Sequence, residues 1–326
     1  MTDIFKGKTI LITGGTGSFG QKFTEMAMEK YKPKKLIIFS RDEMKQWEMA
    51  KKYNYDNIRY FIGDVRDPER LDRAMRGVDI IVHAAALKIV PTAEYNPFEA
   101  IKTNVIGAEN VISAAIDHKV EKVIALSTDK AANPINLYGA TKLCAEKMFI
   151  AANNYSTKEG TSFSVVRYGN VFGSRGSVVP FFRSCREKGV VPITDERMTR
   201  FWITLEQGVI FVIQCLNEMN RGEIFIPKLP SMKVTDLAKA ICPGCKQKMI
   251  GIRAGEKLHE TLVPEDEGTY TLEYDDRFIT YPYVIEHEAK KDGGKSLGTS
   301  FEGYRSDNNT SWLTVEKLRK MVDGID

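Results

Sequence analysis

The stretch Thr13–Gly20, TGGTGSFG, decides the fold that this sequence predicts. It lies between a short β-branched run, Lys8–Thr13, and a helical pattern that begins at Gly17. The spacing is typical of a dinucleotide-binding turn: Gly14 permits the tight turn, Gly17 lets the backbone approach a pyrophosphate, and Gly20 lets helix and strand pack closely. The following helix N-terminus offers free N–H groups and a positive dipole to the anion. A turn with a purely structural role is the alternative.

Strand and helix patterns alternate through the first half of the chain. The strand-like runs are Lys8–Thr13, Lys35–Ser40, Ile58–Asp64, Val78–Ala85, Lys122–Thr128 and Phe163–Tyr168. Helical patterns run between them, from Gly17 to Tyr31, from Pro97 through Ala115, and from about Tyr138 to Ala152. Continuous apolar strands separated by helices predict a parallel sheet that is buried on both faces. Right-handed crossovers then give an α/β, Rossmann-type doubly wound sheet.

The end of the second strand indicates which dinucleotide binds. A carboxylate there would bind the ribose 2′-hydroxyl of NAD, whereas an arginine accommodates the 2′-phosphate of NADP. The sequence reads SRDEMK at residues 40–45, in which Ser40, Arg41 and Lys45 can surround a phosphate. The two acidic residues between them can instead cap the next helix. We therefore expect NADP in preference to NAD.

The predicted cofactor site also includes the end of the third strand, where Asp64 and Val65 are placed to meet the adenine. A strand-end turn is the alternative explanation for those two residues. The full predicted set is Gly14, Thr16, Gly17, Ser18, Phe19, Gly20, Ser40, Arg41, Lys45, Asp64, Val65, Ala85, Lys88, Tyr138 and Lys142.

The pattern loosens after Asn170, where Gly and Pro are scattered and the helical patterns are shorter. We expect residues 1–170 to form the NADP-binding Rossmann domain. Residues 171–326 are expected to form mainly a smaller C-terminal lobe that binds a sugar nucleotide, with later segments returning to the first domain. The polar, Gly-rich residues 288–300 predict a mobile loop.

Composition excludes several classes of protein. The 326 residues are 43% apolar and 28% charged, as in a soluble globular protein and unlike a disordered chain or a small disulfide scaffold. Lys and Arg total 47 against 43 acids, and the net charge of +4 is too weak to indicate nucleic-acid binding. Neither a signal core nor an apolar run near the ~20 residues of a membrane helix is present. The expected protein is cytoplasmic and binds no membrane.

The cysteines and histidines predict no metal site. The five cysteines are an odd, sparse set, as expected of a reduced compartment. Cys242 and Cys245 form a CPGC segment, but no second Cys or His pair has the spacing that would complete a tetrahedral site. We interpret the segment as a turn with two incidental thiols.

A candidate catalytic group follows the fifth strand. Tyr138 and Lys142 form Y-x-x-x-K on one face of a helix, and a nearby ammonium lowers the pKa of a tyrosine. Tyr138 can then take a proton from a substrate hydroxyl while hydride leaves the same carbon. Upstream, Thr128, Asp129 and Lys130 add an acid and a base, which elimination of water requires. By spacing alone, a surface salt bridge or a helix-capping acid explains the Asp–Lys pair equally well.

With the glycine turn, these residues resemble the extended, nucleotide-sugar-modifying branch of the short-chain dehydrogenase/reductase superfamily, over essentially the whole chain. Four motifs are similar to those of inverting UDP-N-acetylglucosamine 4,6-dehydratases: HAAALKIVPTAEYNP (83–97), STDKAANPINLYGATK (127–142), RYGNVFGSRGSVVPFF (167–182) and MTRFWIT (198–204). The resemblance implies a lyase of pseudaminic acid biosynthesis that serves flagellin glycosylation. Its product would be UDP-2-acetamido-2,6-dideoxy-β-L-arabino-hex-4-ulose. The resemblance also implies tightly bound, internally recycled NADP and a homo-oligomer, for example a hexamer.

We hypothesise the following cycle on UDP-N-acetylglucosamine. Tyr138 removes the 4-hydroxyl proton as NADP⁺ accepts hydride from C4, with Thr128 hydrogen-bonded to the 4-oxygen. Lys130 removes the C5 proton, and Asp129 protonates the departing C6 hydroxyl. Hydride returns to C6, and protonation of C5 from the opposite face inverts that centre. Lys130 must be partly neutral to act as a base, and we expect burial and the charge of Lys142 to lower its pKa.

The UDP group needs cations and backbone donors. Arg253 and Glu256 lie in GIRAGEKLHE (residues 251–260), which resembles a family loop that meets the substrate. A surface ion pair is the alternative for any single arginine. The predicted substrate-binding residues are Lys88, Asn170, Arg175, Ser177, Val178, Arg200, Arg253 and Glu256.

Three other functions compete with this hypothesis. A nucleotide-sugar 4-epimerase shares the fold, the cofactor, Tyr138 and Lys142, but it has no need of Asp129 and Lys130. A retaining 4,6-dehydratase differs only in the stereochemistry at C5, which the residues alone do not decide. A non-catalytic NADP-binding protein has no need of the intact tyrosine, lysine and acid–base pair.

Overall fold

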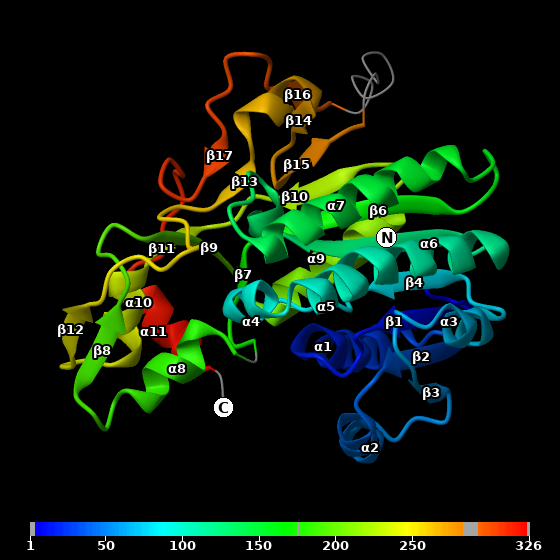
Figure 1. The fold of residues 1–326 in the computed structure, drawn as a ribbon, viewed down its shortest axis with the longest axis horizontal. Coiled ribbons are helices and arrows are strands. Elements are labelled where there is room, and N and C mark those ends of the chain that lie inside the picture. Colours follow the sequence, from blue (N-terminus) through cyan, green and yellow to red (C-terminus); the bar gives the residue numbers. More distant parts are fainter. Residues whose placement is uncertain (1–3, 175, 283–292, 325–326) are drawn as a thin grey trace.

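One ten-stranded sheet runs through the centre of the molecule (Figure 1). The computed structural model describes residues 4–174, 176–282 and 293–324. The strands of this sheet are β1 (Thr9–Thr13), β2 (Lys35–Ser40), β3 (Ile58–Ile62), β4 (Ile80–His83), β5 (Lys122–Thr128), β6 (Ser162–Tyr168), β10 (Ile224–Pro227), β14 (Thr271–Glu273), β15 (Arg277–Thr280) and β16 (Lys295–Ser296). Their order is β16-β14-β15-β10-β6-β5-β4-β1-β2-β3. All pairings from β10 to β3 are parallel, and β15, β14 and β16 add antiparallel pairings at the other edge.

Helices cover both faces of the sheet (Figure 1). They are α1 (Ser18–Met26) with the π-helical continuation η1 (Ala27–Tyr31), α2 (Glu43–Lys52), α3 (Pro68–Met75), α4 (Val90–Tyr95), α5 (Pro97–Ile101), the π-helical η2 (Lys102–Ile106), α6 (Gly107–Asp117), α7 (Leu137–Ala151) and α9 (Leu205–Glu218). On one face α6 packs against α3 and α7, and on the other α1 packs against α9. This burial of both faces explains why β1 and β5 are nearly continuous apolar runs.

Two strands are shorter than their sequence patterns suggest. The strand expected at residues 58–64 ends at Ile62, and the one expected at residues 78–85 covers only Ile80–His83. The latter ends where its partner β1 ends, since His83 pairs with Thr13. Beyond that point the amides of Ala84 and Ala85 donate to the Thr13 hydroxyl, both at 3.2 Å.

The second body is a smaller lobe with its own apolar core. It contains a three-stranded sheet of β7 (Asn170–Val171), β9 (Thr199–Ile203) and β11 (Ser231–Lys233), the strand pair β8 (Val190–Ile193) and β12 (Lys246–Met249), and the helices α8 (Val178–Ser184), α10 (Val234–Ile241) and α11 (Val315–Asp323). Trp202, Phe182 and Leu237 are buried in this core. Residues 171–326 are therefore divided between the lobe and the main sheet, because α9, β10 and β14–β16 belong to the latter.

The remaining elements connect the two bodies. A 3₁₀ turn, η3 (Asp129–Ala131), follows β5, and β13 (Thr261–Val263) pairs with β17 (Tyr304–Arg305) before the 3₁₀ segment η5 (Glu265–Tyr270). Of the loop predicted at residues 288–300, residues 288–292 lie outside the described residues, and Lys295–Ser296 form β16. No helix in the described ranges is long and apolar enough to cross a membrane.

Candidate active site

The carboxyl ends of the parallel strands meet at one edge of the sheet, where ligands of such sheets bind. Thr13 ends β1, Ser40 ends β2, His83 ends β4 and Thr128 ends β5. The catalytic and cofactor residues predicted from the sequence follow these positions, so the sheet brings them to one edge.

The glycine turn has the shape of an anion cradle. Gly14 has a φ of +65°, and a Cβ there would lie 2.9 Å from the Ala85 backbone. A Cβ on Gly20 would lie 2.3 Å from the Gly15 carbonyl oxygen, so only glycine lets α1 approach the strand this closely. No described side chain caps α1 at Gly17, and the first turn contains no acidic residue. Residues of this turn therefore fit a dinucleotide pyrophosphate.

The end of β2 carries the buried hydroxyl of Ser40, and the half-exposed guanidinium of Arg41 follows it. The Ser40 and Thr16 hydroxyls are 2.7 Å apart and buried. Asp42 caps α2 by accepting from the Lys45 amide at 3.0 Å, and it also pairs with the Lys45 ammonium. The helix-cap interpretation of Asp42 is thus confirmed. Arg41 is half-exposed, and among the described residues its guanidinium makes one ion pair, a long contact of 3.8 Å with Asp64.

Asp64 and Val65, which follow the end of β3, form hydrogen bonds with other residues of the protein. Burial acts to raise the pKa of Asp64, but hydrogen bonds from Arg66 bring the pKa below its usual range. The Arg66 Nη2 lies 2.6 Å from the Asp64 carboxylate. Val65 is buried, and its carbonyl accepts from Asn110 at 3.0 Å. The contacts of Asp64 and Val65 with adenine stay predictions.

Tyr138 and Lys142 project from the first turns of α7 and are both buried. Asn136 caps this helix by accepting from the Gly139 amide at 2.8 Å. A Cβ on Gly139 would lie 2.2 Å from the carbonyl oxygen of Lys130, so this glycine lets the helix lie directly against η3. The sequence thus places the tyrosine beside the Asp–Lys pair.

The pKa of Tyr138 differs from the sequence prediction, and so does the role of Lys142. Burial raises the pKa of Tyr138 to about 12, and the nearby charge that counteracts this is that of Lys130. Lys142 instead donates to the carbonyl oxygen of Leu126 at 2.7 Å. Burial lowers the pKa of Lys142 to about 8, against the opposing charge of Glu146. The prediction that Lys142 lowers the tyrosine pKa is therefore wrong for this structure.

Asp129 and Lys130 form a buried acid–base pair. The Oδ1 of Asp129 accepts from the Thr128 hydroxyl at 2.9 Å and from the Lys130 ammonium at 3.0 Å. Asp129 is completely buried, and its Oδ2 has no hydrogen-bond partner among the described residues. Burial raises the pKa of Asp129, and the negative charge of Glu260 raises it further. Burial and Glu260 therefore favour the protonated form of Asp129, whereas the positive charge of Lys130 opposes it.

Sequence reasoning missed Glu260, although it is the last residue of the quoted segment GIRAGEKLHE. Its Oε1 lies 3.2 Å from the Lys130 ammonium and 3.6 Å from the Arg200 Nε. Burial acts to lower the pKa of Lys130, but the charges of Asp129 and Glu260 raise it above its usual value. The prediction that burial and Lys142 hold Lys130 partly neutral is therefore wrong for this structure, because two carboxylates stabilise the ammonium.

Two of the predicted substrate residues have open polar atoms. The Asn170 Oδ1 and the Ser177 hydroxyl are buried and have no partner within the described ranges. Ser177 precedes α8, which Val178 begins. Arg253 and Glu256 form an ion pair of 3.8 Å in which the arginine is more than half exposed.

The other predicted substrate residues are placed less directly. Arg200 donates to the carbonyl oxygens of Thr199, Lys257 and Leu258 at 2.7, 2.9 and 3.1 Å, so this guanidinium is tied to the protein. Partial desolvation and the charge of Lys130 lower the pKa of Lys88. The Lys88 ammonium therefore lies close enough to Lys130 for the two charges to repel each other. Arg175 lies outside the described residues.

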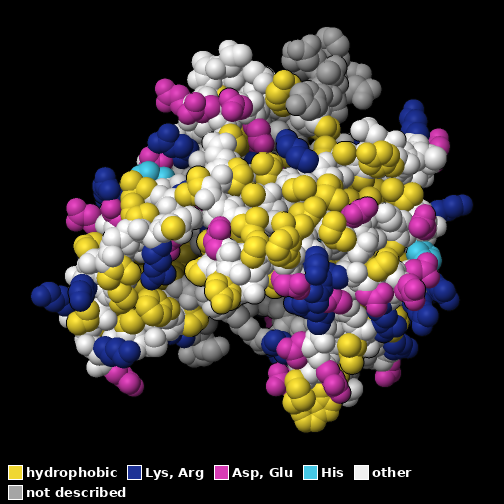
Figure 2. Space-filling model, viewed as in Figure 1, with side chains coloured by type: hydrophobic (Ala, Val, Ile, Leu, Met, Phe, Trp, Pro, Cys, Tyr) yellow, Lys and Arg dark blue, Asp and Glu magenta, His cyan; other side chains and the backbone are white. Residues whose placement is uncertain are grey.

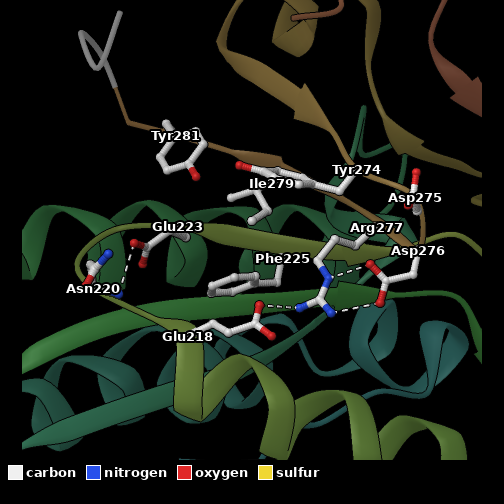
Figure 3. A pocket seen from close by; sticks show the side chains of 10 residues that line it. All are labelled: Glu218, Asn220, Glu223, Phe225, Tyr274, Asp275, Asp276, Arg277, Ile279 and Tyr281. Carbon is white, nitrogen blue, oxygen red and sulfur yellow. Dashed lines mark hydrogen bonds and ion pairs between the residues drawn. The ribbon is translucent and has the colours of Figure 1, made fainter. Parts of the chain in front are cut away.

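A separate hollow of about 440 Å³ lies at the end of α9 and along β10 and β15 (Figure 3). Its Arg277 is paired with Asp276 at 2.8 Å and also with Glu218. None of its lining residues is in the predicted catalytic, cofactor or substrate set. They are Glu218, Asn220, Glu223, Phe225, Tyr274, Asp275, Asp276, Arg277, Ile279 and Tyr281.

The structure gives no metal role to the remaining candidates. Among the described residues, no three His, Cys, Asp or Glu side chains are grouped as metal ligands. Cys242 and Cys245 are free thiols. The Cys242 thiol donates to the Phe182 carbonyl oxygen at 2.9 Å within the core of the lobe.

Comparisons with known proteins cover nearly the whole chain. A family model described as polysaccharide biosynthesis protein matches residues 10–282. A UDP-N-acetylglucosamine 4,6-dehydratase (inverting) from Campylobacter jejuni is 54% identical over 98% of this chain and 98% of its own. A protein from Rickettsia akari named UDP-glucose 4-epimerase is 42% identical over 99% of this chain and 97% of its own.

Solved structures are similar in fold. Pen from Bacillus thuringiensis is 37% identical, covers 98% of both chains and superimposes with a TM-score of 0.89. A dTDP-glucose 4,6-dehydratase from Streptomyces venezuelae, solved with NAD bound, is 22% identical over 77% of this chain and 86% of its own, with a TM-score of 0.69. The predicted α/β Rossmann-type fold is confirmed.

Proposed function

The chain belongs to the polysaccharide biosynthesis protein family, within the extended short-chain dehydrogenase/reductase superfamily, and on this premise we propose that it is an inverting UDP-N-acetylglucosamine 4,6-dehydratase. The observation that carries the proposal is the buried pair of Asp129 and Lys130, 3.0 Å apart, beside Tyr138. Oxidation at C4 needs only the tyrosine. An additional buried acid and base are what elimination of water requires.

The elimination step uses one proton acceptor and one proton donor. Lys130, as a neutral amine, takes the C5 proton, and the C5–H electron pair forms a double bond between C5 and C6. The C6–O bond breaks, and the hydroxyl leaves as water with the proton of Asp129. The open Oδ2 of Asp129 is suited to this donation, because Oδ1 already accepts from Thr128 and Lys130.

Tyr138 begins and closes the cycle. It takes the proton of the 4-hydroxyl, with Thr128 hydrogen-bonded to the 4-oxygen, and later returns that proton so that Asp129 is again an acid. The positive charge of Lys130 favours the tyrosinate that this requires. A solvent-derived proton added to C5 from the opposite face gives the inverted product, UDP-2-acetamido-2,6-dideoxy-β-L-arabino-hex-4-ulose, and Lys130 releases to solvent the proton that it took. The overall reaction is that of a lyase.

A nicotinamide cofactor would accept hydride from C4 and return it to C6, so that it is recycled. The glycine turn would hold its pyrophosphate, and Tyr138 and Lys142 would lie beside its reactive end. We propose NADP as the cofactor, because Arg41 is half-exposed and Asp42, the next residue in the sequence, is already used as the cap of α2.

The substrate proposal rests on open polar groups of the predicted substrate residues. Asn170 and Ser177 offer unpartnered oxygens to the sugar nucleotide, and Val178 begins the helix beside them. Lys88, Arg200, Arg253 and Glu256 are proposed to complete the site, together with Arg175. The position of Lys88 near Lys130 supports this assignment.

We further propose a cytoplasmic homo-oligomer of pseudaminic acid biosynthesis that serves flagellin glycosylation. Free thiols at all described cysteines fit a reducing compartment. The face that carries α4–α7 shows many apolar side chains (Figure 2), and Tyr95 and Phe98 are 88% and 74% exposed. Such exposure supports burial against another copy of the chain.

NMR of the purified protein with UDP-N-acetylglucosamine in deuterated water, without added cofactor, tests the function. A 6-deoxy-4-keto product of L-configuration with deuterium at C5 is expected. A D-configured ketosugar would overturn inversion, and UDP-N-acetylgalactosamine would indicate a nucleotide-sugar 4-epimerase, the class of enzyme for which the Rickettsia akari relative is named. Unchanged substrate would favour a non-catalytic protein.

Two variants test whether Lys130 is the base that removes the C5 proton. Lys130→Gln is expected to abolish deuterium incorporation at C5 and dehydration. Lys248→Gln, which alters an exposed lysine on β12, is the matched control and should retain both. Normal C5 exchange in Lys130→Gln would assign the base to another residue.

A further inference from the structure

We propose that Glu260 is a positioning residue for the acid–base pair: it orients the Lys130 amine, and its negative charge helps Lys130 accept a proton and helps the acid form of Asp129 hold its own proton until the hydroxyl leaves. The inference rests on the proposed function. None of the sequence motifs assigned Glu260 a role.

The Lys130 ammonium lies between two buried carboxylates. Its Nζ is 3.0 Å from Asp129 Oδ1 and 3.2 Å from Glu260 Oε1. The side chains of Asp129 and Glu260 are 1% and 2% exposed, whereas that of Lys130 is 22% exposed. Asp129 lies at the end of β5, but Glu260 lies just before β13. The second carboxylate is therefore brought to the lysine by the tertiary fold.

Glu260 is itself held firmly. Its amide donates to the Ser306 hydroxyl at 3.0 Å. The Arg200 Nε lies 3.6 Å from Oε1, and the Lys257 ammonium lies 4.0 Å from Oε2. Lys257 also donates to the carbonyl oxygen of Ala132, just after η3, at 2.6 Å. The loop that carries Glu260 is thus fixed to the segment that carries Lys130.

This geometry determines where a neutral Lys130 directs its lone pair. A neutral amine has two N–H groups, and Asp129 Oδ1 and Glu260 Oε1 are positioned to accept both. The remaining tetrahedral position of the nitrogen then carries the lone pair, directed away from both carboxylates. Without Glu260, one N–H group loses its acceptor and the amine can rotate. Such misalignment of a reacting atom commonly costs about 100-fold in rate.

The charge of Glu260 favours proton uptake by Lys130 in the elimination. It stabilises the ammonium that forms when Lys130 takes the C5 proton. The same charge acts on Asp129, whose proton it helps to retain until the hydroxyl leaves. The resting pair, carboxylate with ammonium, and the active pair, acid with amine, hold the same number of protons. Moving one proton between Asp129 and Lys130 therefore converts the first into the second.

Other charges face Lys130 from each surrounding element. Arg200 on β9, Lys257 in the loop before Glu260 and Lys88 after β4 are cationic, and Tyr138 on α7 is neutral near pH 7. Removal of the Glu260 charge leaves one carboxylate against these cations. The pKa values of the coupled Asp129–Lys130 pair should then both fall.

The test compares kcat–pH profiles of the full-length wild type and Glu260→Gln, with product formation followed by NMR. Glu260→Gln keeps the shape of the side chain but removes its charge. We expect its whole bell-shaped profile to shift to lower pH. At the optimum, kcat should fall about 10- to 100-fold, with KM for UDP-N-acetylglucosamine within about threefold of wild type. Glu48→Gln, an exposed change on α2, is the control and should match wild type.

A second variant separates positioning from folding. Glu260→Asp keeps the charge one methylene farther away, so its kcat should fall while the pH optimum stays near that of wild type. An unchanged profile in Glu260→Gln, or the same profile in both variants, overturns this inference alone. A wild type that forms no 6-deoxy product overturns the proposed function first, and this inference with it.

Discussion

The guanidinium of Arg167 and the carboxylate of Glu146 form a bidentate ion pair, with N···O distances of 2.6 and 3.1 Å, in which neither side chain is more than 1% exposed. Arg167 lies on β6, and Glu146 lies on α7, which carries Tyr138 and Lys142. Arg167 also binds Glu267, in η5, at 2.7 Å. The pair therefore fixes the catalytic helix to the central sheet.

Removal of one partner should destabilise the protein strongly. Arg167→Met leaves the buried Glu146 carboxylate without its guanidinium, which typically costs about 3–5 kcal/mol. We expect a loss of this size in the free energy of unfolding, measured by urea denaturation. Arg76→Met, which breaks an exposed pair with Asp72, is the control and should cost less than about 1 kcal/mol. Similar losses in both variants would contradict this role for burial.

Gly14 should tolerate no side chain. Both Gly14 and Gly7 have a positive φ, of +65° and +74°, but only Gly14 would place a Cβ against other atoms, 2.9 Å from Ala85. Gly7→Ala should therefore cost only the backbone strain of about 1–2 kcal/mol. Gly14→Ala should cost more and should reduce the amount of cofactor that copurifies, measured by absorbance after denaturation. Equal stability and cofactor content in the two variants would argue against a cradle at Gly14.

Arg41 should set the cofactor preference. Its contact with Asp64 is 3.8 Å long, so the guanidinium is free to turn toward a 2′-phosphate. A hydrogen bond to a charged group contributes about 1.5–3 kcal/mol, so Arg41→Ala should weaken NADP binding about 10- to 150-fold. NAD binding should change little, as measured by calorimetric titration of both cofactors. Arg59→Ala, on β3, is the control, and an unchanged NADP/NAD ratio in Arg41→Ala would assign the preference elsewhere.

The sequence predicts the central strands well, because burial on both faces leaves a continuous apolar run. The expected runs at residues 35–40 and 122–128 coincide with β2 and β5. The antiparallel edge is different. β14 and β15 are short strands, and their sequences carry no pattern that separates them from a lobe. Their place in the main sheet depends on the tertiary fold.

For the candidate site too, the sequence predicts residues that are close along the chain but not those that the tertiary fold brings together. Tyr138, Lys142, Asp129 and Lys130 were found from local spacing, because one strand end and one helix carry them all. Glu260 comes from a loop far along the chain, and local sequence gives no signal that its carboxylate is buried against Lys130. The sequence prediction for the Lys130 pKa has the wrong direction for the same reason. Burial alone would lower that pKa, and local sequence gives no sign of the Glu260 charge that raises it.

The first half of the reaction should depend on the charge of Lys142. Burial lowers the pKa of this lysine to about 8, so the ammonium is present below that pH and is lost above it. Lys142 is proposed to lie beside the reactive end of the cofactor rather than to tune Tyr138, so we expect C4 oxidation to slow as this charge is lost when the pH rises through about 8. Asp129→Asn should stop the reaction before elimination, so the absorbance of the reduced nicotinamide in that background reports oxidation alone.

Substitution of Lys142 by arginine tests whether the decline near pH 8 comes from Lys142 or from another titrating group. An arginine stays protonated well above pH 8, so adding Lys142→Arg to the Asp129→Asn background should remove the decline at high pH. Lys122→Arg in the same background is a matched control. Lys122 also donates to a backbone carbonyl, that of Leu216 at 2.7 Å, and burial also lowers its pKa, but it begins β5 at the opposite end from the site. Its profile should keep the decline near pH 8. A decline that persists in Lys142→Arg would show that another group controls oxidation.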